Sequence, residues 1–362
     1  MRPLSETEVR DAIAQFVPLD TLYDVQPLHR GHIHDTFVSR WPASDLHRQL
    51  LHQRINETVF PDLDRLMGNI ATVSQHLVAK VDDGEAEDLE PLRLVPARDG
   101  APFARTDAGA WRCYVFIDNT TSFDRCSGPE QAFEAACAFG GFQALLHDLP
   151  AEALAITLPN FFSTPHRFAQ LERALSTASA ARRSRAAAEI EFAMARQGIT
   201  GVIDAELRAG RIPTRVVHGD TKLNNILFDR DSGRARAIVD LDTCMPGWSL
   251  YDFGDLVRYT AARSAEDETD LALIGTDLEL YRALEAGYLS AAGSFLTPTE
   301  VRLMPFAARL VTYTIGIRFL ADFLGGDHYF KVDHPEHNLD RARVQLRMVA
   351  AMEDQLPAST PT

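Results

Sequence analysis

The stretch His218-Gly219-Asp220-Thr221-Lys222-Leu223-Asn224-Asn225 decides how this sequence is interpreted. The apolar pair Val216-Val217 precedes it, and a second polar stretch, Asp240-Leu241-Asp242, follows the apolar run Ala237-Ile238-Val239. Apolar runs of this kind predict short strands, so the polar residues of both stretches are expected at strand ends or in the turns beyond them. Two carboxylates and an amide are therefore expected at one rim.

The spacing within these stretches matches the catalytic loop of a kinase. In such a loop an Asp accepts the proton of the attacking hydroxyl, and an Asn five residues later holds a metal ion. Asp220 and Asn225 fit these roles, and Lys222 lies where protein kinases carry a lysine that reaches the transferring phosphoryl group. Asp240 supplies the second metal ligand in this interpretation, with Mg²⁺ and ATP as the expected partners. The alternative, a turn followed by a capping Asp, requires four polar residues to match these offsets by accident.

The composition is ordinary for a globular protein. The chain has 362 residues, enough for two or three lobes, of which 46% are hydrophobic and 24% charged. A net charge of −15 argues against nucleic acid as a partner, because a phosphate backbone requires a basic footprint. Four cysteines without a Cys-x-x-Cys pair favour a reducing compartment. No apolar run predicts a signal peptide or a membrane span, so a cytoplasmic protein without a membrane partner is expected.

The first lobe is expected to span residues 1–117. Ser5 to Glu8 predict the cap of an amphipathic helix that ends near Pro18. A second helix is predicted over residues 61–78. Strands are predicted at Tyr23–Leu28, Thr36–Arg40 and Gln49–Ile55, around Arg93–Val95 and at Trp111–Ile117. Together these patterns predict an antiparallel sheet braced by a helix.

Candidate nucleotide-binding residues of this lobe are less sharply defined. Gly31 lies in a predicted hairpin turn, where it is the single glycine in place of the three of protein kinases. The third strand carries no lysine. Strand alternation places Leu51 and Gln53 on one face, with Leu51 toward the adenine, and Arg54 on the other. Either Gln53 or Arg54 can be the residue that reaches the phosphates, and the pattern does not choose between them.

The second lobe is expected to span residues 118–362 and to be mainly helical. The polar sequence after Ile117 marks the hinge between the lobes. Helices are predicted over Gln131–His147, Phe168–Met194 with one break, and Ile199–Ala209. The first of these carries an apolar stripe that is expected to lie in the core. The stripe consists of Phe133, Ala136, Phe139, Phe142 and Leu146.

Several sequence blocks resemble those of known small-molecule kinases. The chain is similar to the aminoglycoside-phosphotransferase and choline-kinase-like group, and within it to the bacterial N-acetylhexosamine 1-kinases. The resemblance runs from about Gly31 to Arg347, and its two late blocks are the ones that single out the sugar kinases. The blocks are R-G-H-I-H-D-T-F (30–37), L-H-Q-R-I-N (51–56), H-G-D-T-K-L-N-N-I-L (218–227), V-D-L-D-T-C-M-P-G (239–247), Y-D-F-G-D (251–255), R-F-L-A-D-F-L-G-G-D (318–327) and H-P-E-H-N-L (334–339).

This resemblance implies an α+β, bilobal protein-kinase-like fold, with an antiparallel sheet in the N-lobe and Mg²⁺ and ATP bound between the lobes. It implies an adenine contact by the backbone of Phe116, Ile117 and Asp118. His218 and Asp252 are expected to brace the catalytic loop.

For the acceptor, the resemblance implies contacts from His32 and Arg318, with Asp220 as the base. Asp322 lies one helical turn beyond Arg318 and is a further candidate, although the pair can equally be a surface ion pair.

The resemblance implies phosphorylation of the anomeric hydroxyl of N-acetylglucosamine or N-acetylgalactosamine by a monomer or small homo-oligomer. Two alternatives stay open. One is another small-molecule acceptor, such as choline, homoserine or an aminoglycoside, although a cationic acceptor requires an acidic or aromatic cage that no block shows. The other is a non-catalytic, nucleotide-binding pseudokinase, which the missing lysine suggests and which the intact Asp220, Asn225 and Asp240 argue against.

Overall fold

The chain divides into two compact units, and each is described by itself. The computed structural model describes residues 2–20, 22, 24–28, 33–41, 49–86 and 89–357. The first unit consists of Met1–Thr121, Asp148–Thr157 and Leu227–Met245, and the second of Ser122–His147, Leu158–Ile226 and Pro246–Thr362. By this division Asp240 belongs to the first unit, although sequence reasoning assigned it to the second lobe.

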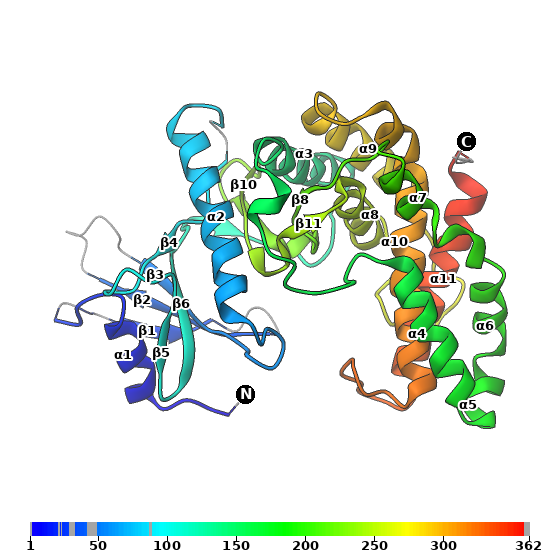
Figure 1. Ribbon diagram of the computed structural model, residues 1–362, viewed down its shortest axis with the longest axis horizontal. Helices are drawn as coiled ribbons and strands as arrows, with labels where there is room; N and C mark the ends of the chain where they lie inside the picture. The colour runs from blue at the N-terminus through cyan, green and yellow to red at the C-terminus, as the bar shows by residue number, and fades with distance from the viewer. Residues whose placement is uncertain are drawn as a thin grey trace. The chain divides into compact units, whose positions relative to one another are not determined.

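The first unit contains the expected antiparallel sheet. Its strand order is β1-β2-β3-β6-β4, and β5 pairs with β6 as a hairpin (Figure 1). The strands are β1 (Asp24–Pro27), β2 (Asp35–Arg40), β3 (Gln49–Arg54), β4 (Leu94–Val95), β5 (Ala104–Thr106) and β6 (Gly109–Val115). Strand β5 was not predicted, because three residues are too few for an alternating pattern to be visible. Strands β3 and β6 are paired so that Gln53 lies opposite Arg112, and this pair is part of the candidate site.

Helix α1 (Glu6–Ala14) covers one face of this sheet. It begins with the predicted capping box, in which Ser5 and Glu8 each accept the main-chain N–H of the other. Its apolar side chains, including Ile13, share a core with Leu50 and Trp111. Helix α2 (Leu63–Asp82), the predicted bracing helix, is capped by Asp62 and runs beside the sheet (Figure 1).

Two small sheets complete the β-structure. One has the order β10-β9-β7 and the other pairs β11 with β8. Their strands are β7 (Thr120–Thr121), β8 (Arg215–Val217), β9 (Ile226–Asp229), β10 (Ala235–Ile238) and β11 (Met245–Gly247). Short 3₁₀ helices are η1 (Ala151–Ala153), η2 (Gln197–Ile199), η3 (Leu223–Asn225) and η4 (Leu241–Thr243). The polar stretches identified in the sequence thus lie directly after β8 and β10.

The second unit is mainly helical, as expected. Its helices are α3 (Pro129–Leu145), α4 (Thr164–Thr177), α5 (Ala180–Arg185), α6 (Ala187–Met194), α7 (Val202–Arg208), α8 (Ser249–Thr260), α9 (Leu278–Ala292), α10 (Pro298–Gly325) and α11 (His337–Gln355). The region 168–194 breaks twice rather than once, since Ser179 caps a new helix by accepting the N–H of Arg182. Phe133 of the predicted core stripe is 41% exposed, so its assignment to the core was wrong.

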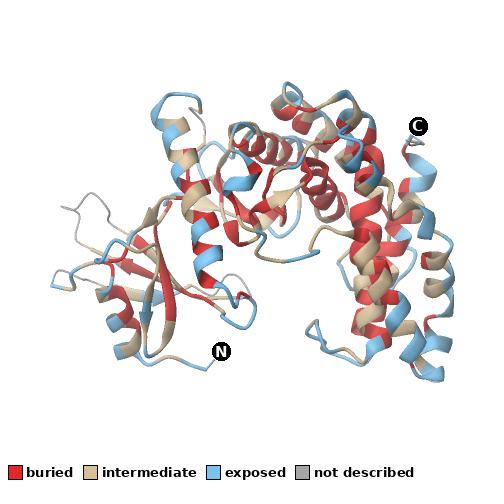
Figure 2. Cartoon of the chain, viewed as in Figure 1, coloured by how far each residue is buried: buried red, intermediate tan, exposed pale blue. Residues whose placement is uncertain are grey.

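Helix α10 forms the centre of the second unit. It packs against α4, α8 and α11, and Figure 2 shows buried residues along much of its length. By length and composition alone α10 could cross a membrane, but 83% of its most apolar window is buried inside the protein. A core helix of a soluble protein has the same character.

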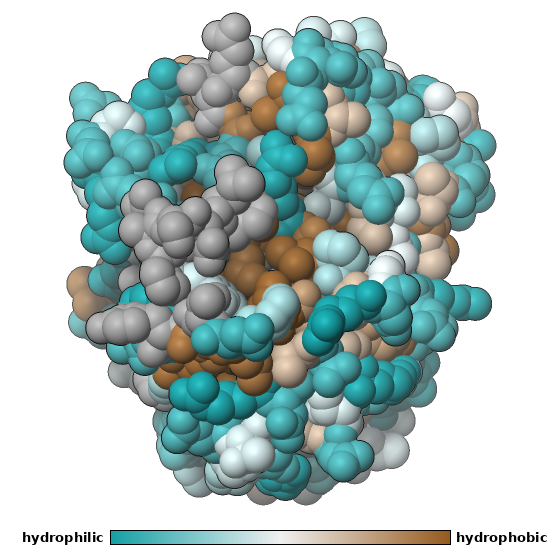
Figure 3. Space-filling model, turned by 90° about the vertical axis from the view of Figure 1, so that its left-hand side faces the viewer, coloured by the Kyte–Doolittle hydropathy of each residue, from teal (hydrophilic) through white to brown (hydrophobic). Residues whose placement is uncertain are grey.

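Gly254 brings α8 and α10 into close contact. A Cβ atom at this position would lie 2.6 Å from Cγ2 of Val311 and 2.7 Å from the main-chain O of Ala307. Because only glycine fits there, α8 can lie directly against α10, and its carboxylates Asp252 and Asp255 are buried. On the face shown in Figure 3, most of the coloured surface is hydrophilic, and several apolar patches lie between the hydrophilic residues.

Candidate active site

The loop between β8 and η3 brings together the residues that the kinase-like spacing singled out. Gly219 turns the chain with φ of 80°, a conformation that favours glycine. The Asn225 Nδ2 donates to the main-chain O of Asp220 at 2.8 Å and to Asp220 Oδ2 at 3.2 Å. The Lys222 Nζ lies 3.0 Å from the same Oδ2. The Asp220 carboxylate, the Lys222 ammonium and the Asn225 amide therefore form one group, with the Asp220 side chain a quarter exposed.

A buried carboxylate on α8 holds this loop by its backbone. Asp252 accepts the main-chain N–H groups of His218 and Gly219, each at 2.8 Å, and also the Nε2 of Gln143. Its main-chain O accepts the Thr221 hydroxyl at 2.7 Å. Burial raises the pKa of Asp252, and these donors together with His218 oppose the rise.

His218 lies beneath the loop rather than on its surface. Its ring is fully buried and meets the edges of Phe139 and Phe142, with centroids 5.4 and 5.6 Å away. The Nδ1 accepts the main-chain N–H of Asp220 at 3.3 Å. This packing suits a supporting residue, since a ring without access to solvent cannot exchange protons freely.

In the first unit, the second polar stretch forms a tight turn. Asp240 has a left-handed backbone, with φ of 63° and ψ of 64°, and η4 follows it. The Asp242 carboxylate, 2% exposed, contacts Arg112 Nη1 through one oxygen and lies 2.5 Å from His34 Nε2 through the other. Burial alone would raise the pKa of Asp242. The opposing effect of Arg112 and His34 is larger and holds this pKa below its ordinary value, so the carboxylate stays ionised.

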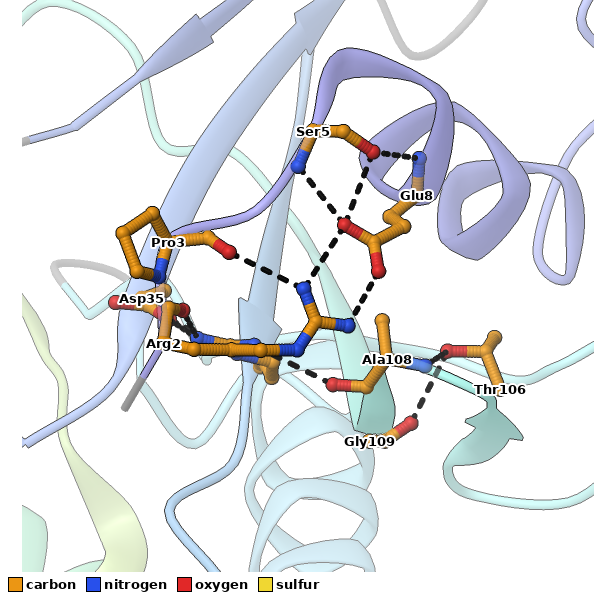
Figure 4. A network of polar contacts seen from close by, with 9 residues as sticks. Arg2, Pro3, Ser5, Glu8, Asp35, Thr106, Ala108 and Gly109 are labelled. Carbon is orange, nitrogen blue, oxygen red and sulfur yellow. Dashed lines mark hydrogen bonds and ion pairs between the residues drawn. The ribbon is translucent and has the colours of Figure 1, made fainter.

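Strand β3 separates the two candidates for phosphate contact. The Gln53 amide accepts from Arg112 Nε at 2.9 Å and donates to the Thr36 hydroxyl at 3.3 Å. Arg54 is buried on the opposite face, where it binds the Asp35 carboxylate and the main-chain oxygens of Arg2 and Ala108. Figure 4 labels these three partner residues. This corrects the suggestion that Arg54 can turn toward a nucleotide, because three protein acceptors already hold its guanidinium.

The remaining nucleotide-binding candidates that the structure describes are Leu51 of β3 and the three residues that follow β6. Phe116 N–H donates to the main-chain O of Gln49, and the main-chain oxygens of Ile117 and Asp118 accept from Thr120 and Arg236. Leu51 is half-buried and pairs across the sheet with Tyr114. Their contact with adenine stays a prediction. Gly31 and His32 lie outside the described residues.

In the second unit, Arg318 of α10 lies among aromatic rings. Its guanidinium carbon is 5.7 Å from the ring centre of Phe161, 5.8 Å from that of Tyr329 and 5.5 Å from that of Phe330. Burial raises the pKa of Tyr251. The charge of Arg318 lowers this pKa, and that of Asp220 raises it. The ring of Tyr251 lies 6.2 Å from that of Phe161, so Tyr251 adjoins this aromatic group.

Asp322 has neither of the two roles considered for it. Its carboxylate accepts the main-chain N–H groups of residues 328–330 at 2.9 to 3.0 Å and the Asn338 Nδ2 at 2.9 Å. A carboxylate with four donors has no capacity left for an ion pair with Arg318 or for a substrate hydroxyl. We correct its assignment: Asp322 holds the loop that carries Tyr329 and Phe330.

The sequence matches a known family over more than half of its length. A model described as "Phosphotransferase enzyme family" covers residues 74–288. The chain belongs to this phosphotransferase family. Within it, the loop 218–225 and the turn 240–242 fall inside the matched region.

Solved structures similar to the phosphotransferase share its fold over nearly the whole chain. An aminoglycoside phosphotransferase from Alicyclobacillus acidocaldarius has 14% identity and a TM-score of 0.64, with 98% of this chain and 97% of that chain covered. A microcompartment-associated aminopropanol kinase has 14% identity and a TM-score of 0.57, with 98% of each chain covered. A choline kinase from Cryptosporidium parvum has 14% identity and a TM-score of 0.55, with 97% and 96% covered. The protein-kinase-like fold, an antiparallel sheet unit with a helical unit, is thereby confirmed.

The donor atoms of the phosphotransferase suit a hard cation such as Mg²⁺. The Nδ2 of Asn225 is used by Asp220, which leaves the amide oxygen as the atom for a metal. Among residues 2–357, so far as the structure describes them, no three His, Cys, Asp or Glu side chains form a metal-holding group.

Four residues that support the turn 240–244 or the carboxylate of Asp252 were not found by sequence reasoning. They are His34, Asn69, Arg112 and Gln143, which hold the turn 240–244 or Asp252. His34 lies within a block that drew attention to its neighbour His32 instead. The other three carry no local signal, because their partners lie far away in the sequence.

Proposed function

We propose that this phosphotransferase transfers the γ-phosphoryl group of ATP to the anomeric hydroxyl of an N-acetylhexosamine in the cytoplasm. The observation that carries the proposal is the arrangement of Asp220, Lys222 and Asn225 on one braced loop. Asp220 accepts the proton of the sugar hydroxyl. The hydroxyl oxygen attacks the γ-phosphorus of ATP, and ADP leaves. The anomeric hydroxyl is more acidic than the other ring hydroxyls, so a carboxylate is a sufficient acceptor.

The other predicted residues take supporting roles in this proposal. Asn225 and Asp240 hold Mg²⁺, which when bound offsets the charge of the phosphate oxygens. Lys222 approaches the transferring group from beside Asp220. Leu51 and the backbone of residues 116–118 take the adenine in this proposal. Gln53 is assigned to the phosphates, and Gly31 stays a predicted phosphate contact.

The charges near Arg318, the residue expected to contact the acceptor, favour a neutral substrate. Burial lowers the pKa of Arg167, and the neighbouring Arg318 lowers it further, so two guanidinium groups lie near each other. The Nε of Arg167 is buried and has no hydrogen-bond partner among the described residues. Two arginines repel a cationic acceptor but offer hydrogen-bond donors to hydroxyl and acetamido oxygens. We assign Arg318 to the sugar on this basis, and His32 on the sequence resemblance alone.

An amino alcohol is the second candidate acceptor. The rings of Phe161, Tyr329 and Phe330 surround a cation, and rings in this arrangement bind quaternary ammonium groups in other proteins. Choline and aminopropanol kinases are also among the similar structures. In this chain, however, the guanidinium of Arg318 already takes the place of the cation.

A panel of acceptors with ATP and Mg²⁺ tests the proposal. N-acetylglucosamine, N-acetylgalactosamine, glucose, choline, 1-amino-2-propanol and an aminoglycoside are compared by ADP release at equal concentrations. We expect the N-acetylhexosamines to give the highest kcat/KM. Phosphorus NMR and a reducing-sugar assay of the product then locate the phosphate. A phosphorylated product that still reduces copper carries the phosphate on another hydroxyl and contradicts the anomeric assignment.

A further inference from the structure

The first unit contains a buried polar cluster whose function the residues above do not explain. It links four separate parts of the chain: His34, Gln53, Arg112 and Asp242. Arg112 is 1% exposed, and its guanidinium binds the Asp242 carboxylate through Nη1 and Gln53 through Nε. Its ring neighbour is Tyr114, 5.5 Å from the guanidinium carbon. Burial of charged groups costs free energy even when they are paired, so the stability of the fold does not by itself explain this cluster.

The hydrogen bonds of His34 fix its tautomer. Its Nδ1 accepts the main-chain N–H of Asn56 at 3.1 Å, so this nitrogen carries no proton. The proton is therefore on Nε2, which donates to the second oxygen of Asp242 at 2.5 Å. Phe60 stacks on the ring with centroids 6.0 Å apart and keeps it in place. His34 is thus a fixed donor to Asp242.

Asp242 itself is poorly suited to bind a metal ion. One of its oxygens is taken by Arg112 and the other by His34, and the residue is 2% exposed. A carboxylate that ligates Mg²⁺ needs an oxygen free to face the ion. Asp240 lies two residues earlier, at the start of the turn, where it is half-buried, and it is the residue proposed above as the Mg²⁺ ligand.

The backbone at Asp240 needs support from its surroundings. A left-handed conformation is unfavourable for a residue with a Cβ atom and persists only where neighbouring contacts enforce it. On the far side of the turn, Asn69 of α2 donates to the main-chain O of Cys244 at 2.9 Å. Between these points Leu241 is buried, and Asp242 is held by Arg112 and His34. The turn is therefore anchored at its middle and its end, and these anchors restrict the backbone at Asp240.

We propose that Arg112 and His34 are positioning residues that act through Asp242 to aim the Asp240 carboxylate at the metal ion. Gln53 orients Arg112. This ion pair between the sheet and the metal-binding turn takes the place of the lysine-based ion pair that protein kinases build from their third strand. The inference rests on the proposed phosphotransfer and adds to it the reason why this chain functions without that lysine.

A charge-removing double variant separates positioning from mere stability. Asp242→Asn leaves Arg112 buried without a partner, so this variant is expected to lose stability. In Arg112→Met/Asp242→Leu both charges are gone, and the unfolding midpoint should return toward that of the wild type. In this double variant we expect the Mg²⁺ concentration for half-maximal activity to be about tenfold or more above that of the wild type, because the Asp240 carboxylate is no longer held in position. Calorimetry should show the same loss in MgATP affinity without any acceptor.

Substitutions at His34 provide the test if the double variant does not fold. His34→Ala keeps the Asp242 carboxylate but removes a donor, and we expect the Mg²⁺ requirement to rise several-fold. His34→Gln can accept from Asn56 and donate to Asp242 at once, so it should restore much of the loss. An unchanged Mg²⁺ requirement in His34→Ala overturns the proposal. A lowered one overturns it too, because it identifies Asp242 as a metal ligand that His34 had occupied.

A control ion pair in the same unit shows whether the effect is specific. Lys80 and Asp148 lie 2.8 Å apart and join α2 to the segment 148–157. Lys80→Met/Asp148→Leu should leave the Mg²⁺ requirement and the MgATP affinity unchanged. Wild-type MgATP affinity in both double variants would show that the Arg112–Asp242 pair is only structural. If no acceptor is phosphorylated by the wild type, the proposed function fails, whereas the calorimetric comparison still decides the positioning role.

Discussion

The loop 218–225 and the turn 240–244 are held in two different ways. The loop is held by its backbone, whose N–H groups at His218 and Gly219 donate to the Asp252 carboxylate. The turn is held by side-chain charge, through Arg112 and Asp242. Backbone donors are present whatever the side chains are, so only their acceptor can be lost. An ion pair has two members, and removing both can be harmless where removing one is not.

The largest expected effect comes from the residue that the backbone-held loop presents. Asp220→Asn keeps the size of the side chain but cannot accept the hydroxyl proton. We expect kcat to fall by about a hundredfold to ten-thousandfold, with ATP affinity retained. Initial rates together with a calorimetric titration of ATP measure both quantities. A variant that turns over like the wild type shows that Asp220 is not the base.

Next in size is the effect at the residue that the charge-held turn presents. Asp240→Asn keeps the left-handed backbone, which Asn tolerates, but weakens an oxygen ligand of the cation. We expect the Mg²⁺ requirement to rise about tenfold or more, and Asn225→Ala to behave alike. Magnesium titrations of activity provide the measurement, with the exposed Asp107→Asn as a control. If both site variants titrate like the control, neither residue is a ligand.

The difference between support by the backbone and support by an ion pair is tested by asking whether a second substitution restores the stability lost in the first. Asp252→Ala leaves main-chain and Gln143 donors unpaired in the core, and we expect it to cost about 3 kcal/mol or more in the free energy of unfolding. Gln143→Leu in the same chain should recover little of this loss, since the main-chain donors remain. Arg112→Met should recover most of the loss caused by Asp242→Leu. Urea unfolding of these single and double variants measures both couplings, and equal rescue in the two pairs would remove the distinction.

The last expected effect lies outside both segments and concerns His52, a buried imidazole in strand β3 of the first unit. Burial lowers the pKa of His52 from 6.5 to about 3. The unfolded chain therefore binds a proton below pH 6.5 that the folded chain refuses, so stability falls as the pH drops from 6.5 toward 3. We expect a loss of about 2 kcal/mol between pH 7 and pH 5 that His52→Gln reduces. Unfolding curves at the two pH values decide, and an equal loss in the variant contradicts the assignment.

Sequence reasoning found the parts of the site whose partners lie nearby in the chain. Asp220, Lys222 and Asn225 are within five residues of one another, and their spacing alone predicts that they come together. The antiparallel sheet and the capping box of α1 were likewise visible as local patterns. The kinase-like resemblance added Asp252, whose contact with the loop spans more than thirty positions.

The rest depends on tertiary contacts that leave no local pattern. Arg112 lies 130 positions from Asp242, and nothing in its own neighbourhood distinguishes it from any arginine in a strand. Asp322 was misassigned for a related reason. Its spacing to Arg318 suggests a pair on one helical face, whereas the main-chain donors that bind it belong to the loop after the helix.

The discontinuity of the first unit affects how the protein can be synthesised. Asn69 lies in the first segment, but the groups that satisfy its amide, at Ala155 and Cys244, belong to the second and third segments. On the ribosome, the N-terminal sheet therefore emerges long before the chain that completes its surroundings. We expect a nascent chain that ends before residue 245 to expose this part of α2 and to depend on chaperones, even though more than half of the protein has been made.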